Sequence, residues 1–458
     1  MVSPVVIELN DACLVAARDG DVLVREPGYA LLDGRAVRHG DTARQQARIA
    51  PQRVSHRFWD TLDQSSVPSE GQWRLSPAEL AFGQLEGMWQ KVGDPDAPAV
   101  LLVPPTFTRA QLGLILGMCR KAGINVVSLV DSALASLSSV GDTRQAIVVD
   151  LTLHRVAGAR FAIDDRVQRQ ATAEIDQFGL MDYQRRFAAT LGDVCVRKTR
   201  FDPMHSAESE QRLYDDLDAV LGQLHDAPEA TWQAQTGDDT IAVTVARQDL
   251  ASAVAELNTT IDGLIDQLID PALGTPMVFV SHRLDFWPDL VGELGHAHGG
   301  VRVLPPLAAV SGATLDLATF ARQSEHIGLI LERPRRGLSL VTSDAAPRTV
   351  SSKPASHILV DQKIYRIADA PFVVGTATTS DQWGHRATGN VKGVSRRHLE
   401  IMRRDARVLL RDLSTYGTWV NGRKVDGEVA VAAGDVVRLG NPGLELRLVQ
   451  ETAFDGQA

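Results

Sequence analysis

Two short polar loops near the end of the chain carry side chains that together could bind an anion. Ser395 and Arg396 lie in the first loop; Ser414 and Thr415 lie in the second, where Gly417 permits a tight backbone turn. Hydroxyl groups donate hydrogen bonds, and the planar guanidinium group suits phosphate or carboxylate. A phosphorylated side chain, with about −1.5 to −2 charges and three acceptor oxygens, would fit such a site. On composition alone, the alternative that these loops merely join strands stays open.

The residues around both loops are typical of a small all-β domain. Gly, Asp and Asn turns separate a series of short β-like runs, namely HILV, KIYRI, FVVG, HLEIM, RVLLRD, VVRLG and LELRLV. This pattern predicts a sandwich or barrel of about a hundred residues. Such a scaffold would hold the two loops rigidly.

Residues 356–451 resemble a forkhead-associated (FHA) domain. The resemblance rests on the spaced motifs FVVGT, GVSRRHLEI, LRDLSTYGTWVNG and GDVVRLG. It implies an eleven-stranded β-sandwich that binds phosphothreonine peptides. In that family's arrangement, Ser395 and Thr415 would hydrogen-bond the phosphate, and Arg396 would pair with it.

The resemblance also assigns the neighbouring residues. We expect Ser414, Tyr416 and Asn421 to belong to the peptide-binding set together with the three phosphate-binding residues. Supporting structural roles fall to Gly375, His398, which would brace the first loop, and Gly417; Asn421 and Gly422 would shape the turn that follows.

Two positions depart from the usual FHA pattern. Thr376 follows Gly375 where the family commonly has arginine, and Tyr416 stands where the family commonly has asparagine. Nearby cations could replace the missing arginine: Arg386, Lys392, Arg397, Arg423 and Lys424. The alternative is that the domain binds an unphosphorylated partner surface.

The first 333 residues have a different pattern, in which strand-like and helix-like segments alternate. Residues 99–104, 145–151 and 276–280 read as buried strands. Thr108 and Gln111 form a capping box before an amphipathic helix, and apolar residues from Leu250 onward recur at helical spacing. The alternation predicts an α/β body.

This body resembles, more diffusely, the actin and heat-shock-chaperone ATPase superfamily, with its duplicated ribonuclease-H-like fold. The similar stretches are VVIELNDACLVAARDG, the segment from AVLLVPPTFT to DSALASL, AIVVDLTLHR and MVFVSHRLDFWPDL. They occupy, in family order, the places of the first phosphate loop, the connecting segment, the second phosphate loop and the adenosine loop.

The departures from that superfamily fall on the residues that would bind ATP. Glycine-rich loops let backbone N–H groups approach phosphates closely, but here Glu8, Asp150 and Ser281 stand in loops that lack those glycines. One interpretation keeps Glu8 and Asp150 as metal-positioning carboxylates of a site for ATP and Mg²⁺, with Ser281 near the nucleoside. We favour a retained fold with a degenerate pocket, no catalytic residues and no bound metal or cofactor.

Composition and charge narrow the classes of function. The 458-residue chain carries a net charge of −10, yet residues 335–458 hold 18 basic and 13 acidic residues, a net +5, which leaves −15 for the rest. A basic C-terminal part suits an anionic ligand, and an acidic body argues against nucleic acid. The absence of long apolar runs and of a secretory-signal pattern, with three scattered cysteines, leads us to expect a cytoplasmic protein without a membrane span.

The sequence therefore predicts an adaptor in three parts: an ATPase-fold body (residues 1–333), a flexible linker (334–355) and an FHA domain (356–451). The FHA domain would read a phosphothreonine made by a Ser/Thr kinase on one partner, while the body docks a second protein. The alternative is a divergent actin/chaperone-type ATPase regulated through its FHA domain. Thr342 and Thr349 in the linker, if phosphorylated, could occupy the chain's own FHA site or a neighbour's.

Overall fold

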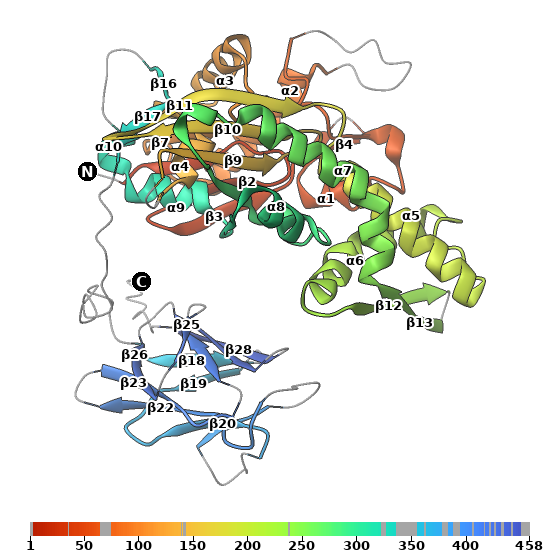
Figure 1. Ribbon diagram of the computed structural model, residues 1–458, viewed down its shortest axis with the longest axis vertical. Coiled ribbons are helices and arrows are strands. Elements are labelled where there is room, and N and C mark those ends of the chain that lie inside the picture. Colours follow the sequence, from red (N-terminus) through yellow and green to blue (C-terminus); the bar gives the residue numbers. More distant parts are fainter. Residues whose placement is uncertain are drawn as a thin grey trace. The chain divides into compact units, whose positions relative to one another are not determined.

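The computed structural model divides the chain into two compact units, residues 1–339 and 340–458, which are described separately here (Figure 1). Thr342, Thr349 and nearly all of the expected linker lie outside the described residues. Across those residues, no helix combines the length and apolar character needed to cross a membrane. The structure describes residues 3–34, 36–64, 75–138, 140, 143–236, 239–321, 327–335, 355–360, 363–377, 383–387, 394–404, 407–415, 417–420, 423–425, 427–431, 435–440 and 443–449.

The first unit is a mixed α/β body built on two six-stranded sheets. The first sheet has the order β16-β8-β7-β1-β2-β3, and the second has the order β15-β14-β9-β10-β11-β17. The strands of the first are β1 (Val5–Glu8), β2 (Leu14–Arg18), β3 (Asp21–Glu26), β7 (Pro98–Val103), β8 (Asn125–Asp131) and β16 (Leu329–Ile330). Those of the second are β9 (Gln145–Leu151), β10 (Val156–Ile163), β11 (Arg166–Ile175), β14 (Met277–Ser281), β15 (Val301–Leu304) and β17 (Glu332–Pro334).

The two sheets repeat one strand arrangement. In each, three consecutive strands form an antiparallel meander, β1-β2-β3 in one and β9-β10-β11 in the other. Two further strands then add in parallel beside the first strand of the meander, β7 and β8 in one sheet and β14 and β15 in the other. Strands β1 and β9 therefore lie near the middle of their sheets, where both faces are covered.

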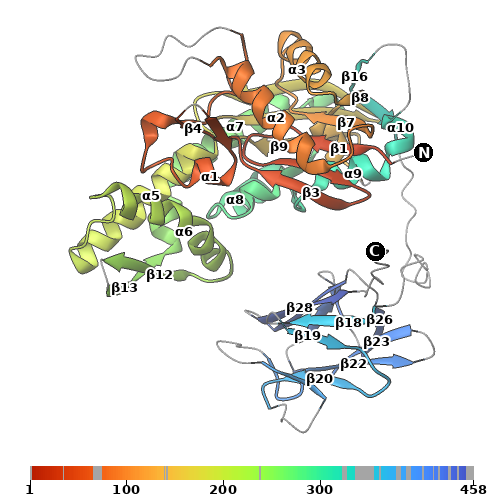
Figure 2. The ribbon, with the colours of Figure 1, turned by 180° about the vertical axis from the view of Figure 1, so that it is seen from behind.

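Helices cover both faces of each sheet (Figures 1 and 2). Val5 and Ile7 of β1 pack toward helices α2 and α3, whereas Val6, pointing to the opposite face, joins a core shared by both sheets. That shared core contains α4 (Ser132–Ser136), α9 (Ala308–Leu315) and α10 (Leu317–Phe320). The outer helices are α2 (Pro77–Val92) and α3 (Arg109–Lys121) on the first sheet, and α5 (Leu180–Thr199), α7 (Arg247–Leu268) and α8 (Leu290–His298) on the second.

Local sequence signals place two of these helices as predicted. Helix α3 begins after Thr108, whose side chain accepts a hydrogen bond from the Gln111 backbone amide. The Gln111 side chain in turn accepts from the Thr108 backbone amide, so the predicted capping box is confirmed. The apolar residues predicted to share one face of α7 are all buried. Between the sheets, Gly312 of α9 sits so close to α4 that a Cβ there would lie 1.9 Å from the Ala135 carbonyl oxygen.

Smaller elements complete the body. Helix α6 (Ala207–Asp226) packs with the hairpin β12 (Glu229–Thr236) and β13 (Asp239–Ala246) at the far end of α5 and α7 (Figure 1). A three-stranded sheet stands beside α1 (Asp41–Arg44) and is formed by β4 (Ala30–Asp33), β5 (Ala36–His39) and β6 (Val54–Ser55). Short 3-10 turns occur at Pro51–Arg53, Pro271–Leu273 and His282–Leu284.

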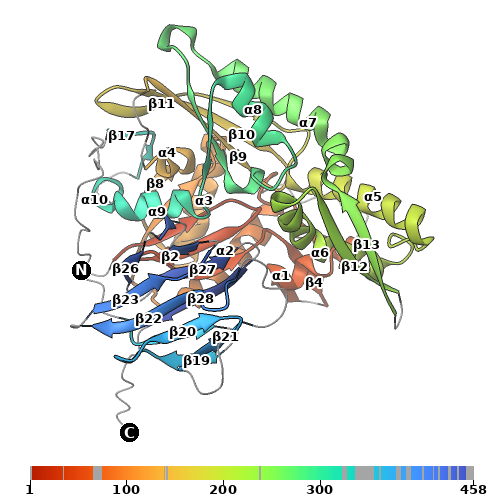
Figure 3. The same cartoon turned by 60° about the horizontal axis from the view of Figure 1, so that its bottom comes forward.

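The second unit is all-β, as the sequence predicts (Figure 3). Its two sheets have the orders β19-β18-β28-β27-β24-β25 and β21-β20-β22-β23-β26, and their inner faces enclose one apolar core. The first comprises β18 (His357–Val360), β19 (Lys363–Arg366), β24 (Thr418–Val420), β25 (Arg423–Lys424), β27 (Val436–Gly440) and β28 (Gly443–Val449). The second comprises β20 (Phe372–Gly375), β21 (Gly384–Arg386), β22 (Leu399–Arg404), β23 (Arg407–Asp412) and β26 (Glu428–Val431).

Candidate functional site

The two polar loops of the C-terminal unit are in direct contact. Strands β22 and β23 form an antiparallel hairpin in which Leu399 pairs with Asp412, so the loop before β22 meets the loop after β23. The Thr415 amide donates a hydrogen bond of 3.1 Å to Ser395 Oγ. Because that oxygen acts as the acceptor, the hydroxyl hydrogen of Ser395 stays available to donate to a ligand.

A buried histidine joins the two loops from below. His398 is fully buried; its Nδ1 accepts from the Ser395 amide at 3.0 Å, and its Nε2 lies 3.0 Å from the Gly417 carbonyl oxygen. These partners require a neutral ring that carries its hydrogen on Nε2. Burial lowers the pKa of His398 and outweighs the opposite effects of the Gly417 carbonyl and Asp412. The bracing role expected of His398 fits this geometry.

Gly375 lets the first loop pass directly over the end of β20. A Cβ at Gly375 would lie 2.2 Å from the carbonyl oxygen of Arg396, which no side chain can tolerate. The close approach is held by backbone bonds from Thr376 N to Ser395 O (3.1 Å), Ala377 N to Arg396 O (3.1 Å) and His398 N to Val374 O (2.8 Å). Only glycine allows this packing.

The second loop is organised by Asp412, which the sequence reasoning missed. Its Oδ1 accepts from the Ser414 amide at 3.0 Å and from Thr418 Oγ1 at 2.8 Å. Burial raises the pKa of Asp412, but these hydrogen bonds from Ser414 and Thr418 outweigh burial and hold the pKa below its usual value. An aspartate two residues before a serine is a common turn signal and could have identified it.

Ser414 and Gly417 complete the turn. Ser414 Oγ accepts from the Gly417 amide at 2.7 Å, and Gly417 adopts a φ of 99°, which favours glycine. Ser414 thus serves the turn itself, while the exposed Thr415 side chain is free to meet a ligand. Tyr416, Asn421 and Gly422 lie outside the described residues.

The two arginines of the first loop, Arg396 and Arg397, differ in whether their side chains form ion pairs. The Arg396 side chain is exposed and forms no hydrogen bond or ion pair with the described residues, whereas the Arg397 side chain pairs with Glu400. Lys392 and the side chains of Arg423 and Lys424 fall outside the described part of the chain. An uncommitted guanidinium beside two hydroxyl groups is an arrangement suited to a phosphate.

Comparison with protein families identifies this part of the chain. Residues 384–440, which include both polar loops, match the family model of the FHA domain. The C-terminal unit carries an FHA domain. FHA domains bind phosphothreonine-containing partners, so a role in phosphothreonine-dependent protein interaction follows for this unit. No curated protein matches the chain in a sequence search.

In the body, the structure brings together the three residues singled out as a remnant nucleotide site. Glu8 ends β1, Asp150 lies in β9 and Ser281 ends β14. Arg283, which the sequence reasoning missed, lies among them: its Nη1 is 3.1 Å from Asp150 Oδ1 and 3.4 Å from Ser281 Oγ, and its Nη2 is 3.5 Å from Glu8 Oε1. Asn10 Nδ2 adds a bond of 3.0 Å to Asp150 Oδ2.

The Arg283 guanidinium supplies positive charge to this cluster from within the chain. The Arg283 side chain is only 12% exposed, and burial favours its neutral form, but Asp150 and Glu8 outweigh burial and raise its pKa. Burial raises the pKa of Glu8, while Arg283 acts to lower it. Arg283 thus provides, beside the two carboxylates, the positive charge that a metal ion would otherwise provide.

Little space remains beside this cluster. The cavity lined by Glu8, Asp150, Ser281 and Arg283 has a volume of about 30 Å³, where about 10–15 Å³ suffices for one water molecule. Small-molecule sites occupy roughly 300–1,000 Å³, so a nucleoside does not fit this cavity. Among the described residues, no group of three or more His, Cys, Asp or Glu side chains is placed to hold a metal ion.

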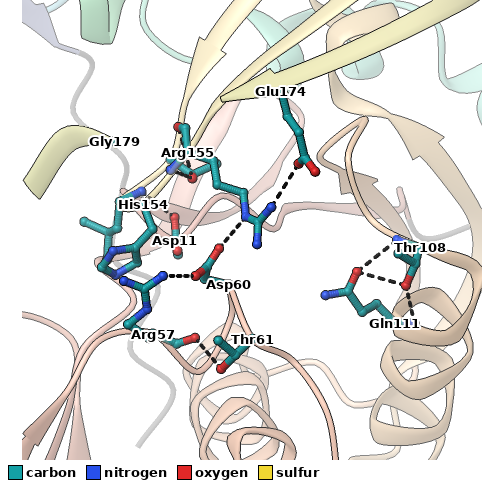
Figure 4. Close-up of polar contacts among 12 residues, drawn as sticks. Asp11, Arg57, Asp60, Thr61, Thr108, Gln111, His154, Arg155, Glu174 and Gly179 are labelled. Atoms are coloured by element: carbon teal, nitrogen blue, oxygen red, sulfur yellow. Dashed lines mark hydrogen bonds and ion pairs between the residues drawn. The ribbon is translucent and has the colours of Figure 1, made fainter. Parts of the chain in front are cut away.

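Further contacts join the loop between β9 and β10 to Asp11, which follows β1, and to Asp60, which precedes α2 (Figure 4). Asp60, with 2% of its side chain exposed, accepts from Arg57 and from Arg155, and Arg155 also pairs with Glu174 at 3.1 Å. The Leu153 amide donates to Asp11 Oδ1 at 2.7 Å. Burial raises the pKa of Asp11 to about 7. These contacts hold the two sheets' loops together.

Acidification should loosen the first FHA loop. The folded pKa of His398 is below its unfolded value of about 6.5. Its contribution to stability is therefore fully present above about pH 6.5 and is lost as the pH falls from there through the folded pKa. We expect protection of the Ser395 amide from hydrogen exchange, corrected for intrinsic rates, to fall between pH 7.5 and 5.5. In His398→Ala it should be low at both pH values, and equal wild-type protection at both would contradict the proposed ring state.

Removing Arg283 should destabilise the body strongly. Arg283→Ala leaves the buried Glu8 and the half-buried Asp150 without their cation, and loss of one partner of a buried ion pair costs about 3–5 kcal/mol. The matched control, Arg166→Ala, removes an exposed pair with Glu332 and should cost at most about 1 kcal/mol.

Chemical unfolding followed by circular dichroism measures both effects. The deficit of Arg283→Ala should narrow from pH 7.5 to 5.5, because Glu8, with its raised pKa, binds a proton more readily in the folded variant. A variant as stable as the Arg166→Ala control would show that the Arg283 cluster is not a stabilising element.

Proposed function

We propose that the FHA domain binds a phosphothreonine on a partner protein through Ser395, Arg396 and Thr415. The observation that carries this proposal is the contact between the two loops, in which the Thr415 amide bonds to Ser395 Oγ. It supports this set because it brings the Ser395 hydroxyl beside the backbone of Thr415, and Arg396 directly follows Ser395 in the chain. A phosphate with three acceptor oxygens matches that set of donors.

The support for binding lies in rigidity as well as in chemistry. His398 fixes the first loop and Asp412 fixes the second, so the donors do not have to be ordered by the ligand. A preorganised site loses less conformational entropy on binding. The net charge of +5 over residues 335–458 also favours approach of an anionic peptide.

For the body, the proposal is a divergent actin/chaperone-type fold that no longer serves as an ATPase. The repeated strand order of the two sheets supports duplication of one ribonuclease-H-like unit. Arg283 between Glu8 and Asp150, and the small cavity beside them, support a degenerate nucleotide site. Such a body would dock a second protein.

The whole chain is then a cytoplasmic adaptor. Its FHA domain would recognise a protein phosphorylated by a Ser/Thr kinase, and its body would hold another partner. The divergent ATPase regulated through the FHA domain is the competing proposal. It requires Arg283 to move away from both carboxylates before a nucleotide and Mg²⁺ could enter.

Replacement of Arg396 tests the phosphothreonine proposal. Arg396→Ala should weaken binding of a phosphothreonine peptide by about 1.5–3 kcal/mol, the scale of a hydrogen bond to a charged group. Arg407→Ala is the matched control, because Arg407 is also exposed and lies at the opposite end of β23 from the loops. Calorimetry with phosphorylated and unphosphorylated forms of one peptide measures both; equal affinity of Arg396→Ala and wild type would reject this pocket.

Nucleotide should leave the body's stability unchanged. A ligand present at 100 times its dissociation constant adds about 2.7 kcal/mol of stability, which appears as a rise in melting temperature. Melting curves with and without millimolar Mg-ATP should coincide for the wild type. A clear upward shift would instead support the ATPase alternative and would contradict the degenerate site.

A further inference from the structure

A second uncommitted arginine stands beside the first FHA loop. Arg386 ends β21, the edge strand that pairs in parallel with β20. Its side chain is exposed and forms no hydrogen bond or ion pair with any described residue. The remaining question is which surface this guanidinium faces.

The strand register settles which way Arg386 points. Val374 pairs with His385, and both side chains are buried in the core of the sandwich. Gly375 pairs with Arg386 one step further along. Because side chains alternate along a strand, Gly375 and Arg386 both face outward, on the same side of the sheet.

The first FHA loop crosses that same outer face. The Arg396 carbonyl oxygen occupies the position directly outside Gly375, 2.2 Å from where a Cβ would be. Neighbouring strands are about 4.8 Å apart, so Arg386 starts about one strand spacing from the backbone of Arg396. The backbone bond from Ala387 N to Gly375 O, 3.0 Å long, fixes this neighbourhood.

The cations near the loop therefore separate into two kinds. Arg397 is neutralised by Glu400. Arg396 and Arg386 lie on adjacent segments of the same face, and no described residue forms an ion pair with either. Like charges on neighbouring segments repel each other when no anion is bound, and the arrangement becomes favourable when each meets its own anionic group.

We propose that Arg386 forms a second anion subsite, which binds an acidic side chain of the peptide that carries the phosphothreonine. This inference rests on the proposed function, in which Arg396, Ser395 and Thr415 hold the phosphate. An extended peptide advances about 3.3 Å per residue, so a subsite one to two strand spacings away selects an Asp or Glu within about three residues of the phosphothreonine.

The test compares peptides that differ only in the flanking charge. Four phosphothreonine peptides of equal length carry either alanine on both sides, glutamate two residues before, glutamate two residues after, or phosphoserine two residues after. The wild-type full-length chain should bind one glutamate peptide about three- to tenfold more tightly than the alanine peptide at low salt, and this preference should weaken as salt rises. The phosphoserine arm shows whether a second phosphate substitutes for the carboxylate.

Arg386→Ala should remove the preference, and it should weaken binding of the alanine peptide much less than binding of the preferred glutamate peptide. Arg407→Ala, which removes an equally exposed charge at the far end of β23, should keep the preference. Arg386→Lys should retain part of it, since the charge remains but the planar fork is lost.

The outcomes distinguish the two proposals. If no phosphothreonine peptide binds the wild type, or if Arg396→Ala binds all of them unchanged, the proposed function fails. If the wild type binds but shows no preference for acid, or if Arg386→Ala keeps that preference, the second subsite is overturned. An equal loss for all four peptides in Arg386→Ala would place Arg386 on the phosphate itself and also overturn the subsite.

Discussion

The binding surface of the C-terminal unit depends on a single buried imidazole. His398 accepts a hydrogen bond from the Ser395 amide on one side and donates to the Gly417 carbonyl on the other, so one neutral ring sets the distance between two loops that are about twenty residues apart in sequence. Arg396 and Thr415 contribute to this framework through their backbones, while their side chains are exposed. The side chains that stabilise the loops, such as His398, are therefore different from the exposed side chains that we propose bind the ligand.

The central polar cluster of the body differs from the FHA loops, because its charged side chains already pair with one another. In a nucleotide-binding site, such carboxylates position a metal ion that is bound together with the nucleotide. Here Arg283 supplies the positive charge permanently from within the chain, between Glu8 and Asp150. Together with the contacts of Asp60 and Asp11 to the β9–β10 loop, it joins the two sheets without a ligand.

Much of the fold could be predicted from local patterns. The capping box at Thr108 and the apolar face of α7 are short-range signals, and the structure reproduces them. The spaced Gly, Ser, Arg and His motifs predicted the FHA domain, since each residue type performs a task that its own chemistry dictates. Asp412 and Arg283 were missed for different reasons. Asp412 had a local turn signal that was not used, whereas the role of Arg283 depends on carboxylates 133 and 275 residues away in sequence.

The sequence by itself determined which groups can donate, accept or carry charge: the hydroxyls and guanidinium of the two loops, and the loss of glycines from the body's loops. Tertiary structure decided which of these groups meet. Strand register places Arg386 beside Gly375, close packing brings the Arg396 carbonyl over that glycine, and burial pairs Arg283 with two carboxylates. The physical reason is that sheet pairing and core packing are long-range interactions, so no local pattern specifies the distance between residues that only the completed fold brings together.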